Sequence, residues 1–400
     1  MGIHNYDRKY HRALELLQEE NISKRNKKLI LDMVNDLILE NLSKSRLLKY
    51  LGTLKLIAVG IGKDLDQATI EDVKTFIGKI QQKDYSVWTK ESYKVIIRRF
   101  YQWLHGMKGK EYPEIVKWVN IHISRAEKKL PSDEELLIEE DIIKVMSVLH
   151  HPRDKALLSL LWETGCRISE LGNLKIKNVI FDKYGAMLSV HGKTGARKIR
   201  VISSTAYLST WLNNHPQRNN KEASVWINVG NVRYNKPMAY GNIFITIRRW
   251  FTKAGINKKC NPHLFRHSRA TFMAHHLTEF QMNQYFGWIQ GSDMPATYVH
   301  MSGKNVDTAI LKMNGIEIDT RKDEQKILPK TCPRCTTINA PDGKQCNQCG
   351  GFLDLTVALK IEEESRVRDV TRDKWDKIMN LLLQDEEARA FFAKKLESGV

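Results

Sequence analysis

The sequence predicts a mainly α-helical protein of several domains that contains one small antiparallel β-sheet. Three observations support this fold class. Apolar residues recur at helical spacing through most of the first 125 residues, three short β-rich segments lie between residues 179 and 202, and two Cys-x-x-Cys pairs lie between residues 332 and 349. A chain of 400 residues is long enough for two or three domains.

The charge balance favours a polyanionic partner. The chain contains 64 Lys and Arg against 46 Asp and Glu, a formal net charge of +18. Cations that neutralise phosphates release counterions, so this surplus favours nucleic acid, and a merely soluble basic protein is the alternative. The sequence has no apolar run long enough to span a membrane and no apolar core of a signal peptide at its start. We therefore expect a cytoplasmic protein with reduced cysteines and no membrane partner.

Residues 1–125 are expected to form a helical domain. Ser23 is placed to cap one helix, and Thr69 with Asp72 three residues later resembles a capping box at the start of another. Residues 126–138 are charged and contain a proline, which is typical of a linker between domains.

The helix expected after Thr89 carries three basic residues on one face. Lys90, Lys94 and Arg98 recur every four residues, away from the apolar stripe of the same helix. Such a face is either solvated or lies against a phosphate backbone. The second alternative makes these three residues candidates for DNA binding.

Residues 139–318 are expected to form a second domain of mixed structure. An apolar helical run ends at Gly165. Three short segments then predict a small antiparallel sheet, with Lys193 on a tight turn. These segments are Val179–Phe181, Met187–Val190 and Lys198–Ile202.

A helix with a distinct start follows, with Asn261 as its cap and Pro262 at its first position. His263 and Arg266 are three residues apart and share a face near the free N–H groups of this helix, a suitable arrangement for one phosphodiester. This pair alone is a weak signal, and a structural role is the alternative. His263 and His267 have the spacing of a metal-binding pair, but no His-Glu-x-x-His pattern or nearby carboxylate ligand supports a metal.

A five-part signature resembles the tyrosine recombinase (phage integrase) family. Its parts occur in order in ETGCRISEL, HGKTGARKIRV, PHLFRHSRATF and GWIQGSDMPATYVH, and the linker KLPSDEELLIEEDIIKVM also resembles the family's bridge into its catalytic domain. The resemblance covers most of residues 20–315. It implies a helical DNA-clamping domain followed by a mixed α/β catalytic domain, with the catalytic residues Arg167, Lys193, His263, Arg266, Trp288 and Tyr298.

The resemblance also implies a role for each residue. Tyr298 would attack the scissile phosphate and form a 3′-phosphotyrosyl link, so rejoining needs no cofactor. Arg167 and Arg266 would hold the non-bridging oxygens, where charge grows in the transition state. Lys193 would protonate the leaving oxygen, and His263 would contact the phosphate or assist proton transfer from the nucleophile.

The chain matches the family at an acidic position beside the arginines and departs from the family pattern in two ways near the nucleophile. Glu170 matches an acidic position that supports the arginines without touching DNA. Trp288 occupies the place usually held by His, and it donates one N–H but cannot shuttle a proton. Ten residues separate Trp288 from Tyr298, where many bacterial members have nine, so the loop that presents Tyr298 is expected to differ. Tyr285 is the competing tyrosine, and the spacing favours Tyr298 as the nucleophile.

The resemblance implies double-stranded DNA as the partner and a homotetramer on paired sites. It favours the integrase of a mobile element, with resolution of chromosome dimers as the second role. A type IB topoisomerase shares the chemistry but relaxes DNA without site preference. The non-enzyme alternative is a DNA-binding regulator on the same scaffold, which the intact signature disfavours.

The paired cysteines predict a zinc ribbon at residues 328–356. Two knuckles that each supply two thiolates suit one tetrahedral Zn²⁺, and the short polar loop between them has too little apolar mass to fold without a metal. Dithiol redox chemistry, two disulfides and an iron ion are the alternatives. The candidate ligands are Cys332, Cys335, Cys346 and Cys349, whereas Cys166 and Cys260 are isolated and are expected to be packing residues.

Residues 357–400 are expected to form a C-terminal helical segment. The ribbon and this segment are not part of the common recombinase pattern, so DNA contact, protein contact and anchoring of the last helix all remain open roles for the ribbon. The last helix has one apolar face, formed by Trp375, Ile378, Met379 and Leu382.

Overall fold

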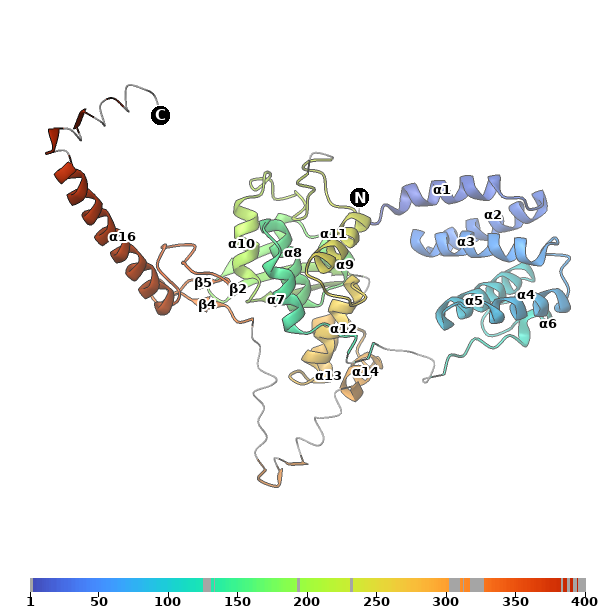
Figure 1. The fold of residues 1–400 in the computed structure, drawn as a ribbon. Helices are drawn as coiled ribbons and strands as arrows, with labels where there is room; N and C mark the ends of the chain where they lie inside the picture. The colour runs from blue at the N-terminus through green and yellow to red at the C-terminus, as the bar shows by residue number, and fades with distance from the viewer. Residues whose placement is uncertain are drawn as a thin grey trace. The chain divides into compact units, whose positions relative to one another are not determined.

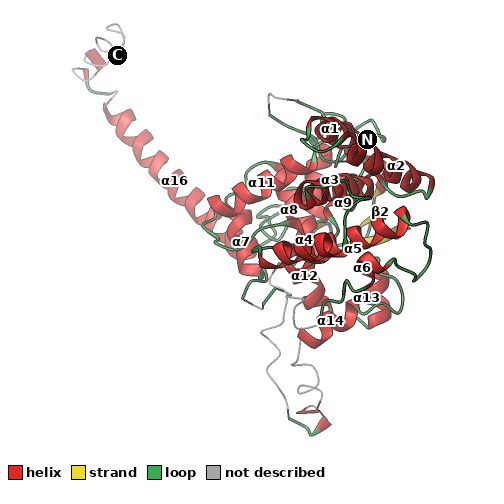
Figure 2. Ribbon diagram, turned by 90° about the vertical axis from the view of Figure 1, so that its right-hand side faces the viewer, coloured by secondary structure: helices red, strands yellow, loops and turns green. Residues whose placement is uncertain are grey.

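In the computed structural model, the described residues are 3–124, 131–132, 134–192, 195–230, 233–301, 310–311, 313–316, 327–382, 384–386, 389–390 and 394. They form a mainly helical structure with small antiparallel sheets, which confirms the predicted fold class (Figures 1 and 2). The chain divides into two compact units. Unit 1 comprises 1–136 and 227–246, and unit 2 comprises 137–226 and 247–400. In the part of the chain described, no helix combines the length and apolar character needed to cross a membrane.

Unit 1 is a helical bundle with one continuous apolar core, in which α3 packs against α1, α2, α4 and α5. Figure 1 shows these helices in blue and cyan. The helices are α1 (Tyr6–Glu19), α2 (Lys24–Leu39), α3 (Lys44–Ile61), α4 (Ile70–Gln82), α5 (Val87–Leu104) and the short α6 (Glu114–Lys117).

The helix starts of unit 1 follow from side-chain caps. The hydroxyl of Ser23 accepts a hydrogen bond from the backbone N–H of Asn26 at 3.0 Å, and Thr69 and Asp72 form a capping box, so both predicted caps are confirmed. The expected start of α5 after Thr89 was wrong by three residues, since the helix begins at Val87. Ser86 is the residue that caps this helix. Its hydroxyl oxygen accepts a hydrogen bond from the backbone N–H of Thr89 at 3.2 Å.

Residues 227–246 belong to unit 1 although most of the flanking sequence belongs to unit 2. The backbone N–H of Tyr240 donates to the carbonyl of Ile3 at 2.9 Å, and the Tyr240 ring lies 4.8 Å from the ring of His4. These contacts join the N-terminal residues to the start of α11 (Tyr240–Lys253). A boundary placed along the sequence alone misses such a contact between distant segments.

Unit 2 is built around α8 (Pro152–Thr164), which packs against α7 (Glu139–Ser147), α10 (Thr205–Asn213) and α12 (Pro262–Met273). The leucines of α8 are fully buried. Gly165 ends α8 with φ at 55°, a conformation that favours glycine, and a Cβ there would lie 2.9 Å from Cβ of Arg269. The predicted end of this helix is confirmed.

A three-stranded antiparallel sheet follows the short α9 (Ile168–Gly172) and a 3₁₀ turn at Ile176–Asn178. Ala186, Leu188 and Val190 alternate as buried residues along β2. The predicted sheet is thus confirmed, whereas Lys193 lies outside the described residues. The strands are β1 (Val179–Asp182), β2 (Gly185–Gly192) and β3 (Gly195–Val201), paired in the order β1-β2-β3.

The remaining helices of the catalytic region are α13 (Glu279–Phe286) and α14 (Met294–Met301), which pack against α12. A second small sheet pairs β4 (Lys330–Thr331) with β5 (Ile338–Asn339) beside the cysteines.

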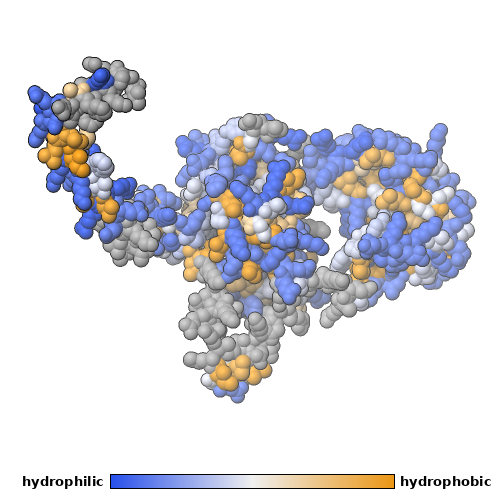
Figure 3. Space-filling model, in the orientation of Figure 1, coloured by the Kyte–Doolittle hydropathy of each residue, from blue (hydrophilic) through white to orange (hydrophobic). Residues whose placement is uncertain are grey.

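The long α16 (Leu355–Leu382) closes the described fold. Its apolar face is solvent-exposed, with Trp375 62% exposed, and Figure 3 shows orange apolar side chains along this helix.

Candidate active site and metal site

The start of α12 places the His-x-x-Arg pair. The side-chain oxygen of Asn261 accepts the N–H of Leu264 at 3.0 Å, and Pro262 occupies the first helical position, as the sequence predicts. His263 therefore sits in the first turn, where its side chain is exposed, and Arg266 sits one turn later, where it is 6% exposed.

Backbone carbonyls hold both guanidinium groups. Arg266 donates to the carbonyl of Gly165 at 3.2 Å and to that of Phe286 at 2.7 Å. Arg167 donates to the carbonyl of Gly287 at 3.3 Å. Burial and, after it, the positive charge of Arg167 lower the pKa of Arg266 to about 10. The carbonyls of Phe286 and Gly287 that accept from the two guanidiniums are adjacent in the chain, so the two cations share one region. Two fixed cations in one place are suited to a phosphate.

Glu170 lies beneath this pair and is 1% exposed. Its carboxylate accepts hydrogen bonds from both terminal nitrogens of Arg197 at 2.7 Å and from one nitrogen of Arg167 at 2.9 Å. Burial acts to raise the pKa of Glu170, but the hydrogen bonds and charges of Arg197 and Arg167 outweigh it and lower the pKa below its ordinary value. Glu170 is thus placed to orient Arg167, and the bracing role expected from the sequence stays a proposal.

Arg197 is a site residue that the sequence analysis missed. Its Nε donates to the carbonyl of Tyr285 at 2.9 Å, so it ties β3 to α13 as well as to Glu170. The available signal was strand alternation, since Arg197 shares a face with the buried Ile199 and Val201. An arginine on the inward face of a strand requires a carboxylate partner.

Tyr298 is 1% exposed and stacks on Trp288, with ring centroids 5.5 Å apart and an interplanar angle of 4°. The guanidinium carbon of Arg266 lies 5.3 Å from the Trp288 ring centre. Burial raises the pKa of Tyr298 to about 12, although Arg266 opposes this shift. The structure therefore brings together Tyr298, Trp288 and Arg266.

His267 is the second residue that the sequence analysis missed in this site. Its Nδ1 lies 2.8 Å from the hydroxyl oxygen of Tyr298. Sequence spacing had linked His267 to His263 only as a metal pair. Among the described residues, metal-ligand clustering is confined to the four ribbon cysteines. The spacing did indicate that His267 lies on the same face of α12 as the phosphate-directed pair.

Tyr285, the competing tyrosine, has a structural environment. Its hydroxyl donates to the carbonyl of Glu163 at 3.1 Å, its ring contacts that of Phe286, and burial raises its pKa. It therefore lies against the main chain of α8.

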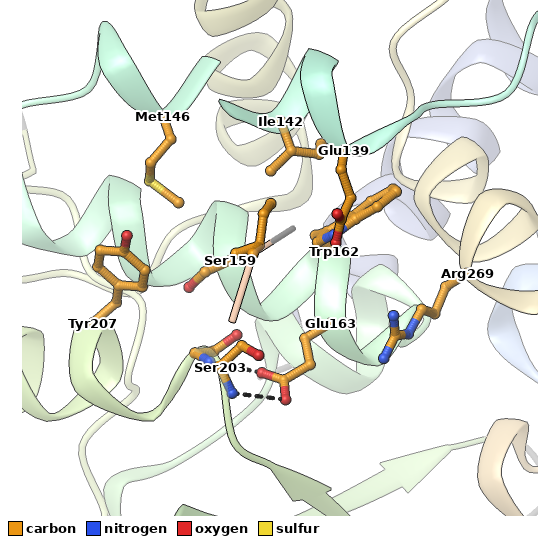
Figure 4. Close-up of a pocket in the computed structure, with 11 residues that line it drawn as sticks. Glu139, Ile142, Met146, Ser159, Trp162, Glu163, Ser203, Tyr207 and Arg269 are labelled. Atoms are coloured by element: carbon orange, nitrogen blue, oxygen red, sulfur yellow. Dashed lines mark hydrogen bonds between the residues drawn. The ribbon is translucent and has the colours of Figure 1, made fainter. Parts of the chain in front are cut away.

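A small cavity in unit 2 is not a second active site. It measures about 20 Å³, which holds a single water molecule, and Figure 4 shows its lining side chains from α7, α8 and the start of α10. The Glu163 carboxylate beside it accepts backbone N–H groups of Ile202, Ser203 and Ser204 at 2.6–3.1 Å. These bonds cap the start of α10 and leave little capacity for a ligand.

The three basic residues of α5 line two neighbouring hollows. Lys90 and Lys94 line a groove beside residues 120–123, and Lys90 donates to the carbonyl of Gln81 at 2.8 Å. Arg98 instead lines a separate hollow, and its guanidinium stacks 3.8 Å from the Tyr112 ring centre. Both hollows include Ile121, so Arg98 lies beside the groove of the two lysines.

The four ribbon cysteines have the geometry of a metal site. Their sulfurs all lie within 4.8 Å of one another, with Cys332 and Cys349 3.6 Å apart and Cys335 and Cys346 3.5 Å apart. Such separations fit four thiolates around one ion at about 2.3 Å. Backbone N–H groups of Arg334 and Gln348 lie 3.4 Å from the sulfurs of Cys332 and Cys346, and such donors stabilise thiolates.

The ribbon also contacts the catalytic region of unit 2. Asp342 accepts the Tyr207 hydroxyl at 2.7 Å and pairs with the Lys155 ammonium at 2.9 Å. Burial acts to raise the pKa of Asp342, but the Tyr207 hydrogen bond and Lys155 lower it. The loop between the two cysteine pairs is therefore fastened to α8 and α10.

Comparisons with known proteins agree with this geometry. Residues 135–304 match the model of the phage integrase family. The chain is similar to the tyrosine recombinase XerA of Pyrococcus furiosus, with 26% identity over 275 residues, which cover 67% of this chain and 90% of that protein. It is 27% identical over 297 residues to the tyrosine recombinase XerA of Pyrococcus horikoshii, covering 72% and 96%.

Solved structures share the fold. The chain is similar to the XerH site-specific recombinase in a post-cleavage complex with a palindromic difH substrate, with a TM-score of 0.55, 17% identity and coverage of 77% and 95%. The Tn1549 transposon integrase in complex with transposon right end DNA gives a TM-score of 0.56 at 15% identity, with coverage of 72% and 98%. The family match ends at residue 304, so the candidate metal site lies outside it.

Proposed function

We propose that this chain, a tyrosine-type site-specific recombinase that carries a phage integrase family domain at residues 135–304, cuts and rejoins DNA through Tyr298. The observation that carries the proposal is the stacking of Tyr298 on Trp288 beside the buried guanidinium of Arg266. A nucleophile is thereby placed next to a cationic phosphate site.

In the proposed reaction, the hydroxyl oxygen of Tyr298 forms a bond to phosphorus as the bond from phosphorus to the 5′ oxygen breaks. The products are a 3′-phosphotyrosyl link and a free 5′-hydroxyl. The link retains the energy of the phosphodiester, so the reverse attack rejoins DNA without a nucleotide cofactor. Arg167 and Arg266 stabilise the charge on the non-bridging oxygens, because their guanidiniums are already held in place.

The remaining roles are proposed from the family resemblance together with the geometry. Lys193 donates the proton to the leaving 5′ oxygen, and His263 hydrogen-bonds the phosphate. The His263 side chain reaches the surface, but protein atoms around part of its ring lower its pKa by desolvation, and the charges of Arg266 and Arg167 lower it further, so the imidazole is neutral at neutral pH. Trp288 supports Tyr298 by ring stacking.

We propose that both units contact one duplex and that Lys90 and Lys94 bind its phosphates. Replacing both lysines by Ala should weaken DNA binding and reduce the slope of log affinity against log salt by about two. Arg98→Ala is the matched comparison and should change the slope less, because its guanidinium stacks on Tyr112. An unchanged slope in the double variant would place the duplex elsewhere on unit 1.

A homotetramer on paired sites follows from the chemistry. Two duplexes present four strands, each strand requires one Tyr298, and each chain supplies one. We propose integration or excision of a mobile element in the cytoplasm as the role. Recombination between repeats that flank the gene would support this role, whereas recombination confined to one chromosomal site would favour dimer resolution.

We also propose that one Zn²⁺ binds Cys332, Cys335, Cys346 and Cys349 as a structural ion. Its support is the compact thiol cluster with backbone donors nearby. Elemental analysis of the purified chain should give one zinc per molecule. Iron in its place, or metal-free reduced thiols, would contradict the assignment.

A nicked target site tests the central proposal, because loss of a short fragment after cleavage leaves the enzyme trapped on DNA. The unaltered protein should give a protein–DNA adduct that survives denaturing gels. Mass spectrometry should identify Tyr298 as the residue joined to DNA. Tyr298→Phe should form none, while Tyr285→Phe should still form it, because the Tyr285 hydroxyl donates to the Glu163 carbonyl on α8. An adduct in Tyr298→Phe would refute the assignment of Tyr298 as the nucleophile.

A further inference from the structure

The hydrogen-bond partner of the Tyr298 hydroxyl is a histidine outside the family signature. Nδ1 of His267 lies 2.8 Å from the hydroxyl oxygen, and the two ring centroids are 5.8 Å apart. His267 lies on α12 one turn beyond His263, whereas Tyr298 comes from α14. A nitrogen at this distance is positioned to accept the phenolic proton.

The nucleophile needs such an acceptor. With a pKa of about 12, the Tyr298 phenol is ionised in about one molecule in 10⁵ at pH 7. The neighbouring Trp288 has no basic atom, since an indole N–H only donates. A buried phenol beside an indole therefore stays protonated unless another group takes its proton.

The protonation state of His267 suits this task. Burial lowers its pKa, and the nearby His263 and the positive charge of Arg266 on the same helix lower it further. Among the described groups on the neighbouring α14, Tyr298 is the titratable partner that contacts it. The imidazole is thus neutral at pH 7 and has an unprotonated ring nitrogen available.

We infer that His267 is the general base for Tyr298. During cleavage the phenolic proton moves to Nδ1 as the oxygen–phosphorus bond forms, and the departing 5′ oxygen takes its proton from the acid assigned to Lys193. During rejoining the imidazolium returns the proton to the phenolate as the phosphotyrosyl bond breaks. This inference rests on the proposed function, in which Tyr298 is the nucleophile.

A resting latch is the competing interpretation of the same bond. Tyr298 is 1% exposed, so a hydrogen bond to His267 could hold its hydroxyl away from DNA. The two interpretations predict opposite signs. Removal of a base slows cleavage, whereas removal of a latch leaves it unchanged or accelerates it.

The experiment measures single-turnover adduct formation on the nicked target site for the unaltered protein, His267→Ala and His267→Asn. Asn places an amide oxygen near the position of Nδ1, so it keeps a hydrogen-bond acceptor but takes no proton. Both variants should be slower by about 10² or more. Their rates should rise with pH between 7 and 9, as the phenolate fraction grows tenfold per unit. His276→Ala is the matched control, because His276 is exposed in the turn that follows the same helix.

The decisive measurement replaces Tyr298 by a more acidic phenol in the His267→Ala variant. A fluorinated tyrosine at position 298 should restore much of the rate lost in His267→Ala, because a phenol with a lower pKa needs less help to ionise. A misfolded site would not be rescued in this way.

The outcomes separate the two claims. Full activity of His267→Asn, or no rescue of His267→Ala by the fluorinated tyrosine, overturns the assignment of His267 as the general base. Absence of an adduct in the unaltered protein instead overturns the proposed function.

Discussion

The recombinase site and the cysteine ribbon each bring together groups that are unfavourable as neighbours. In the first these are positively charged guanidiniums, and in the second they are thiols that must lose protons to bind a metal. In the recombinase site, the buried Glu170 carboxylate offsets the charges of Arg167 and Arg197, and backbone carbonyls hold the guanidiniums. In the ribbon, the four cysteine sulfurs lie within 4.8 Å of one another. The charges of the first site are balanced by the chain's own side chains, whereas the second has the geometry that four thiolates take around a metal ion.

Metal removal should expose this difference most strongly. A structural Zn²⁺ contributes about 10–16 kcal/mol of binding free energy in small zinc domains, so chelation should unfold the ribbon. Hydrogen exchange should then show loss of protection at residues 330–352 and little change on α12. Equal loss in both regions would show that the recombinase site depends on the ribbon.

Glu170→Ala should give the next largest effect, on the recombinase site itself. It leaves the buried Arg197 without its carboxylate, and breaking a buried pair costs about 3–5 kcal/mol. Thermal unfolding should show a clear fall in Tm. The double variant Glu170→Met, Arg197→Met should recover most of it, since both charges are gone. A double variant as unstable as the single one would rule out charge imbalance as the cause.

Arg167→Ala and Arg266→Ala should each lower strand cleavage by about 10²–10³, as loss of a transition-state donor does. DNA binding should survive, because many other phosphate contacts remain. Filter binding and adduct formation on the same preparations separate the two effects. If both fall together, these arginines anchor DNA and do not act in the chemistry.

Asp342→Asn should have the smallest effect. It removes the charge that pairs with Lys155 but keeps an acceptor for the Tyr207 hydroxyl, so we expect a loss of about 1 kcal/mol in stability. The zinc content should be unchanged. Asp376→Asn, at an exposed position of α16, is a charge-matched comparison. Loss of zinc in Asp342→Asn would mean that docking and metal binding are one event.

Local patterns predicted much of this molecule. The Asn261 cap, the glycine at the end of α8 and the three strands follow from short stretches of sequence, because each depends on neighbours within a few residues. The signature residues were identified by resemblance, and their roles stay proposals.

The missed features join distant segments. Arg197 reaches Glu170 across 27 positions, and His267 reaches Tyr298 across 31. Neither distance has a local spacing rule, since tertiary packing decides which side chains meet.

The acceptors that hold the two arginines belong to the main chain at positions 165, 286 and 287. Every amino acid carries a carbonyl, so the acceptor for Arg266 at position 286 survives any side-chain replacement there. A mutational scan at Phe286 will therefore report on ring packing against Trp288 and on the contact of the ring with the Arg266 guanidinium, 5.0 Å from the ring centre, while the carbonyl acceptor stays in place. The hydrogen-bonding part of the hold over this guanidinium is a property of the chain path, and a rotated peptide plane would be needed to remove it.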